Sequence, residues 1–130
     1  MSLSNFLESA ILTHVMSTYT VHVAYGTASA SEDGSTAAEP AGGGYARKAF
    51  GLYTVTFTGD DYYAENDADI DFAEATADQG LITHVYFFDA ITAGNFLGEV
   101  SFADLGQSDI SVITGTTVSF PAGDCKLTME

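Results

Sequence analysis

The chain has 130 residues, of which 46% are hydrophobic, which is enough to close one core but not two. Three Lys and Arg residues stand against eighteen Asp and Glu residues, which gives a formal net charge of -15 at pH 7. Such a charge opposes binding to a nucleic acid backbone or to an anionic membrane, so neither is an expected partner. We expect a single domain over residues 1–130.

One cysteine and the composition of the first residues bear on where the protein is made. Cys125 has no second cysteine to pair with, so a disulfide framework is excluded, and a quietly packed thiol is the simplest interpretation. The first sixteen residues lack a basic region and carry Glu8 and His14 within their apolar part, which argues against a signal peptide and a membrane span. We therefore expect synthesis in the cytosol.

A helix is predicted over residues 1–17. Its apolar side chains recur at helical spacing as Leu3, Phe6, Leu7, Ala10, Ile11, His14 and Val15. Asn5 and Glu8 can form a capping box, and Ser2 or Ser4 is the alternative cap. Two interpretations of the apolar stripe stay open: it covers the sheet, or it docks on a neighbouring subunit.

The next segments are predicted as a strand and a long loop. Residues of Thr18–Gly26 alternate between apolar and polar, which indicates a half-buried strand. Residues 27–44 are small or acidic and include three consecutive glycines, so we expect a flexible loop or arm without helix or strand.

Two basic residues, Arg47 and Lys48, precede the next predicted strand, Leu52–Thr58. In so acidic a chain they invite a salt bridge, either within the subunit or between subunits. The following segment, Gly59–Asp71, is read as an acidic turn region.

The centre of the chain predicts a β-hairpin. Two apolar runs, Leu81–Phe88 and Asn95–Phe102, flank the turn-forming residues Asp89–Gly94. The first run is apolar on both faces, which is typical of a strand in the middle of a sheet. In the second run, Phe96, Val100 and Phe102 are expected on one face, and Leu97, Glu99 and Ser101 on the face that meets water.

Short strands are also predicted at Ile70–Ala75, Ile110–Thr114, Thr117–Pro121 and Cys125–Glu130. One helix and about seven or eight strands joined by Gly- and Asp-bearing turns indicate a mainly β fold, an antiparallel β-sandwich or barrel with one N-terminal α-helix.

The residues indicate no catalytic chemistry. His14, His22 and His84 lack metal-ligand spacing, and we interpret them as core or edge histidines, with His84 the most buried and Asp89 its candidate partner. No nucleophile motif is present, so an enzyme and a cofactor are not expected. The acidic segment Asp60–Asp71 does not fit an EF-hand, but it could hold a structural or adventitious Ca²⁺ ion.

Several motifs resemble a family of small virion proteins of tailed bacteriophages, described as tail-fibre-like or head-decoration proteins. They are the opening helix Leu3–Leu12, the strand Thr20–Tyr25, GGGYAR at Gly42–Arg47, ATADQGLITHVYFFDAITAGNFLGEV at Ala75–Val100 and TTVSFPAGDCKLTM at Thr116–Met129. The resemblance spans nearly the whole chain, although Gln79 stands where such proteins often have Trp.

The resemblance implies a structural role in the virion, after synthesis in the host cytoplasm. Its first implication is a capsid cement or decoration protein that binds the major capsid protein in many copies, as a homo-oligomer, with a homotrimer as the expected state. The candidate contact residues are Phe6, Leu7, Ile11, Arg47 and Lys48, together with the 27–44 arm. A tail-fibre or baseplate-adjacent component is the alternative, and a cation-dependent glycan-binding module, supported by the acidic segment alone, is a third.

Overall fold

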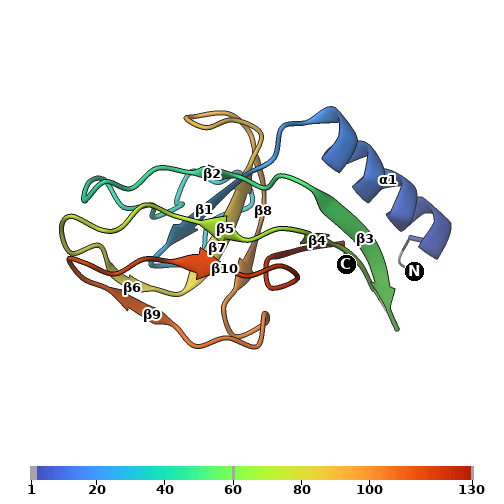
Figure 1. Cartoon of the computed structure of the whole chain (residues 1–130). Helices are drawn as coiled ribbons and strands as arrows, with labels where there is room; N and C mark the ends of the chain where they lie inside the picture. The colour runs from blue at the N-terminus through green and yellow to red at the C-terminus, as the bar shows by residue number, and fades with distance from the viewer. Residues whose placement is uncertain (1–2, 60, 130) are drawn as a thin grey trace.

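The computed structural model describes residues 3–59 and 61–129, and it is mainly β with one N-terminal helix (Figure 1). The elements are α1 (Asn5–Thr18), β1 (His22–Gly26), β2 (Lys48–Ala49), β3 (Tyr53–Thr58), β4 (Asp61–Asn66), β5 (Ile70–Asp71), β6 (Gly80–Ile82), β7 (His84–Phe88), β8 (Phe96–Ser101), β9 (Ile110–Val112), β10 (Ser119–Phe120) and β11 (Lys126–Met129). All the strand pairs among these residues are antiparallel, which confirms the predicted fold class.

The described strands form open sheets, and none of these sheets closes into a barrel. The largest has the order β2-β1-β7-β8, and a second has the order β11-β4-β3. Two small sheets, β10-β5 and β6-β9, complete the body of the molecule. Helix α1 packs on β4 and β3 and runs beside β3 at one end of the molecule (Figure 1).

The core is aromatic and joins all the sheets. Its main cluster takes side chains from α1, from both larger sheets and from the small sheets, among them Leu12, Tyr25, Phe87, Phe102 and Phe120. Neighbouring rings meet edge to face, as in the pairs of Phe120 with Phe72 and with Phe102.

The predicted helix is present, but it is turned relative to the expectation. It begins at Asn5, and the Ser4 hydroxyl caps it by accepting a hydrogen bond from the Leu7 backbone N–H at 3.2 Å. The residues buried against the sheet are Glu8, Leu12 and Met16, spaced four apart. The predicted stripe covers the sheet only in part, because Val15 packs against the main core and Ile11 is half-buried, whereas its other residues are exposed. Leu12 and Met16 belong to the main core cluster, so this side of the helix faces inward.

The first predicted strand is shorter than expected and buried on both faces. Helix α1 runs to Thr18, so β1 begins only at His22. Ala24, on the face expected to be solvated, is fully buried with Tyr86 and Phe88. The half-buried prediction is wrong because Ala30 and Ala37, both from the 27–44 segment, cover this face.

The acidic segment Gly59–Asp71 was interpreted as a turn region, and this is wrong for its first half. It contains β4, which lies between β11 and β3. Ala64 and Asn66 point inward and are buried, while the acidic Asp61 and Glu65 alternate with them and stay half-buried. The period of two is hard to see in the sequence because the buried residues are small or polar and tyrosines occur on both faces, as Tyr62 and Tyr63.

The predicted central hairpin is confirmed, because β7 pairs with β8 and lies between β1 and β8. Its first run divides at Thr83, however, and Gly80–Ile82 forms β6, which pairs with β9. A β-bulge at Leu97 places Phe88 opposite Phe96 and Phe87 opposite Gly98.

The bulge corrects the expected faces of β8, because one extra residue reverses the alternation. Phe96 packs with Tyr86 and Phe88 in the smaller cluster, whereas Val100 packs on the main core. The last predicted strands are confirmed in position but are shorter, as β5, β9, β10 and β11.

Candidate functional site

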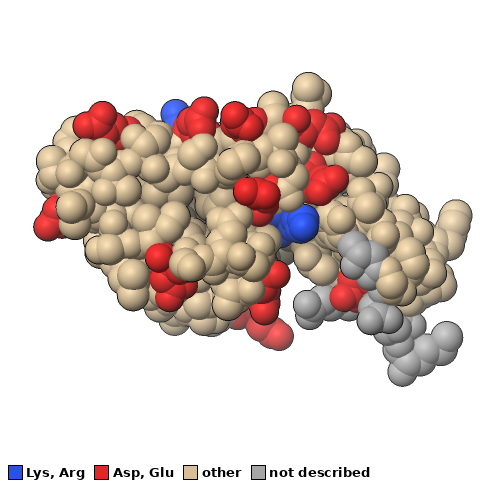
Figure 2. Space-filling model, turned by 60° about the horizontal axis from the view of Figure 1, so that its bottom comes forward, with Lys and Arg blue, Asp and Glu red and all other residues tan. Residues whose placement is uncertain are grey.

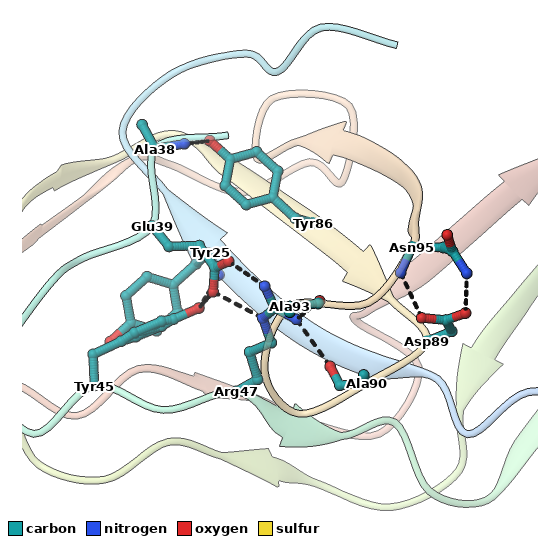
Figure 3. A network of polar contacts seen from close by, with 10 residues as sticks. All are labelled: Tyr25, Ala38, Glu39, Tyr45, Arg47, Tyr86, Asp89, Ala90, Ala93 and Asn95. Atoms are coloured by element: carbon teal, nitrogen blue, oxygen red, sulfur yellow. Dashed lines mark hydrogen bonds and ion pairs between the residues drawn. The ribbon is translucent and has the colours of Figure 1, made fainter. Parts of the chain in front are cut away.

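Arg47 is the centre of a polar network that fastens the glycine-rich loop to the hairpin turn (Figure 3). Its guanidinium donates to both carboxylate oxygens of Glu39, at 2.7 Å and 3.1 Å, in a bidentate ion pair. It also donates to the carbonyls of Ala90 and Ala93 at 2.9 Å and 2.8 Å, and its Cζ lies 3.6 Å from the centre of the Phe88 ring. The predicted salt bridge thus forms within the subunit.

Two tyrosines extend this network into the core. The Tyr45 hydroxyl donates to Glu39 at 2.6 Å and accepts from the Tyr25 backbone N–H at 3.2 Å. Burial, followed by the hydrogen bond to Glu39, raises the pKa of Tyr45 far above its ordinary value. The Tyr25 hydroxyl donates to Gln79 at 2.6 Å, and the Gln79 amide donates to the Gly43 carbonyl at 3.1 Å. Gln79 therefore binds the glycine loop by hydrogen bonds at the position where the virion proteins that the sequence resembles often have Trp.

The 27–39 part of the loop is anchored through Tyr86 and Glu99. The Tyr86 hydroxyl accepts from the Ala38 N–H at 3.2 Å and donates to the Ala28 carbonyl. The Glu99 carboxylate accepts from the Ser29 hydroxyl at 2.5 Å and from the Ala30 N–H at 2.7 Å. The face of β8 that was expected to meet water thus holds the loop.

The five predicted contact residues lie in separate places. Phe6 and Leu7 are exposed on α1, and Ile11 is half-buried beside Leu97. Lys48 is half-buried in β2, and Arg47 is engaged in the internal network. Their role in contacts with other subunits stays a prediction.

The alternating carboxylates of the acidic segment hold neighbouring strands. Asp67 accepts from the Thr54 hydroxyl at 2.6 Å, Asp69 from the Ala122 N–H at 3.0 Å, and Asp71 from the Ser119 hydroxyl. Within residues 3–59 and 61–129, no group of three or more His, Cys, Asp or Glu side chains is arranged to hold a metal ion. Asp60, part of the predicted cation segment, lies outside the described residues.

The histidines and the cysteine are placed by local packing. His14 is exposed, while His22 and His84 are half-buried. The Nδ1 atom of His84 lies 2.8 Å from the Thr83 hydroxyl. The predicted partner Asp89 instead accepts two hydrogen bonds from Asn95, at 2.6 Å and 2.8 Å, which lower the pKa of Asp89.

Cys125 is fully buried, and burial raises the pKa of its thiol well above its ordinary value. Such a thiol is protonated at neutral pH and is a packing group, as the sequence indicated.

A family model described as "Podophage GP4 fiber I protein gp80" matches residues 2–128. The chain belongs to this family. No curated protein matches it. The predicted resemblance to small virion proteins of tailed phages is thereby confirmed, and the fibre name fits the predicted tail-fibre alternative better than the capsid cement interpretation.

In this member of the podophage fibre family, one hollow lined by described residues measures about 530 Å³. Its lining is His84, Glu99, Val100, Ser101, Asp104, Leu105, Lys126 and Thr128. It is polar and carries both signs of charge, and Glu99 is already bonded to the loop. Sequence reasoning missed it because its residues come from strands that are distant along the chain.

Acidic side chains are spread over much of the face shown in Figure 2, and basic ones occupy small areas of it. Lys126 lies with its ammonium 5.1 Å from the centre of the Tyr63 ring. Among the described helices, none is both long and apolar enough to cross a bilayer.

Proposed function

We propose that this protein is a structural subunit of a fibre on the virion of a podophage. The observation that carries the proposal is the match of the fibre family model to residues 2–128. Because the match extends over the helix, the loop and all the sheets, the whole fold is the unit that the fibre would use.

The molecule has the physical properties that such a role requires. The polar network around Arg47 and the loop anchored by Tyr86 and Glu99 hold the long connections on the sheet, which favours a body that keeps its shape under load. Phe6 and Leu7, on the outer side of α1, are apolar surface available for contact with another protein. The function would therefore rest on surface fit rather than on catalysis.

The test is the position of this chain in an electron microscopy reconstruction of the virion, with its copy number measured by quantitative mass spectrometry against the major capsid protein. We expect its fold in density that projects from the particle as a fibre. Density flat on the shell, in copy numbers that follow the capsid lattice, would overturn the proposal and support the cement role. The trimer implied by the resemblance stays a prediction, which the same reconstruction tests.

A further inference from the structure

Strand β3, residues Tyr53–Thr58, is an open edge of its sheet. The order β11-β4-β3 gives it β4 on one side, and no other described strand pairs with it. In an antiparallel pair, alternate residues direct their N–H and C=O groups away from the partner strand. Six residues of edge therefore present a row of backbone groups to which another strand can bind.

The sequence of β3, YTVTFT, lacks the features that usually protect an edge. It has no charge, no proline and no glycine, and its register with β4 is continuous from Tyr53 to Thr58. The other outer strands of the two larger sheets differ: β8 carries Glu99 and a bulge, β11 carries Lys126 and β2 carries Lys48. The strands of the two small sheets are only two or three residues long. In a chain of net charge -15, an uncharged edge of this length is a place where another strand can approach without facing carboxylates on the strand itself.

Helix α1 presents an apolar side chain on its side toward β3. Ile11 and Val15 lie beside Leu97 and Met129, on the side of the helix toward β11. Because β3 is on the opposite side of β4, the other shoulder of α1 lies toward β3. At 3.6 residues per turn, Phe6 projects from that shoulder, and it is 83% exposed.

Two further residues, Leu52 and Glu8, bear on the surface around this edge. Leu52, which directly precedes β3, is 74% exposed. The acidic residue of α1, Glu8, is turned inward and 2% exposed, and no described atom forms a hydrogen bond with its Oε2. The strip formed by Phe6, Leu52 and β3 therefore combines exposed apolar groups with open backbone groups, and its own residues carry no charge.

We propose that this strip joins two copies of the chain, with β3 pairing antiparallel to β3 of the second copy about a twofold axis. A basic partner would gain nothing from uncharged residues and would be drawn to the many carboxylates elsewhere. A second copy presents the same strand, whose own six residues carry no charge, and the Asp67 carboxylate beside it is engaged by the Thr54 hydroxyl. An antiparallel strand pair is self-complementary, as a twofold contact requires.

This inference rests on the proposed function in one respect: a fibre subunit has to contact other subunits, and the strip would supply one such contact. It concerns the joint between copies, whereas the reconstruction tests the place in the virion. Fibre density together with a monomeric protein in solution would overturn the pairing and leave the proposed function standing.

The first experiment measures the mass of the full chain by sedimentation velocity and light scattering from micromolar to millimolar concentration. We expect the wild-type protein to form a reversible dimer. For Phe6→Asp we expect the dissociation constant of the dimer to rise at least tenfold, with an unchanged circular dichroism spectrum. Ile91→Asp is the matched control, since Ile91 is 57% exposed on the hairpin turn and the change adds the same charge. A wild-type monomer or trimer, or equal effects of the two variants, would overturn the proposal.

The second experiment tests the strand pairing directly. Residues opposite each other in an antiparallel pair have Cβ atoms about 4.5–5.5 Å apart, within reach of a disulfide. Thr54→Cys alone tests the register in which residue 54 faces its own copy, and Thr56→Cys alone tests the same for residue 56. A mixture of the two variants tests the register in which residue 54 faces residue 56. Thr128→Cys on β11 is the control. We expect an oxidised dimer from one of the three β3 combinations. No crosslink from any of them, or an equal crosslink from the control, would refute the twofold pairing. Cys125 is buried and does not interfere.

Discussion

At the scale of single residues, Arg47 carries more interactions than any other charged group in the network of Figure 3. We expect Arg47→Lys to lower the free energy of unfolding by about 2–3 kcal/mol, because a lysine cannot make the bidentate pair with Glu39 and reach the turn carbonyls together. The Arg47 side chain is 9% exposed, so water replaces these contacts poorly. Urea unfolding followed by circular dichroism measures the loss.

Lys48 provides the control for this prediction. It is the adjacent basic residue, half-buried in β2, and Lys48→Arg also exchanges the two basic side chain types. We expect a change within about 0.5 kcal/mol. Equal losses for the two variants would show that the bidentate geometry at Arg47 contributes little.

At the scale of elements, the 27–44 segment has no helix or strand and depends on anchors from the sheet. Tyr86→Phe removes the hydroxyl that binds Ala28 and Ala38 while it keeps the buried ring. We expect a loss of about 1–2 kcal/mol in the free energy of unfolding and faster amide hydrogen exchange confined to residues 27–39. Hydrogen exchange with mass spectrometry resolves this segment from the strands.

Tyr62→Phe is the matched control, because Tyr62 lies half-buried in β4, in the other large sheet. Tyr62→Phe also removes one hydroxyl, and we expect it to leave amide hydrogen exchange in residues 27–39 unchanged. Fast exchange across this segment in the wild-type protein would instead support the flexible arm that the sequence predicted.

Helices and strands could be predicted from the sequence where a local residue pattern is enough to determine them. The central hairpin follows from two apolar runs and a turn, and helix α1 follows from its spacing and cap. Strand β4 was missed because its fully buried residues are the small Ala64 and the polar Asn66, and Tyr62 is the one large side chain on the same face. The face of α1 could not be foreseen, since its buried residues, Glu8, Leu12 and Met16, include a carboxylate and do not follow the apolar stripe.

At the scale of the whole molecule, the spacing of turns was enough to predict a mainly β fold, but not the order of the sheets. That order depends on pairings between distant segments, such as β10 with β5 and β6 with β9. The network around Arg47 was partly predictable, because a basic residue in an acidic chain indicates an ion pair. Its partner Glu39 and its ring contact with Phe88 depend on tertiary structure.

The net charge of -15 gives the last prediction, which concerns ionic strength. Salt shortens the screening length from about 30 Å at 0.01 M to about 8 Å at 0.15 M, so it weakens the repulsion within one chain and between two. We expect NaCl to raise the midpoint of thermal unfolding and to tighten the dimer. CaCl₂ at matched ionic strength should do no more, because Asp67, Asp69 and Asp71 each hold a separate hydrogen-bond partner. A further rise with millimolar Ca²⁺, lost in Asp69→Asn, would contradict this and assign a cation site to the acidic segment.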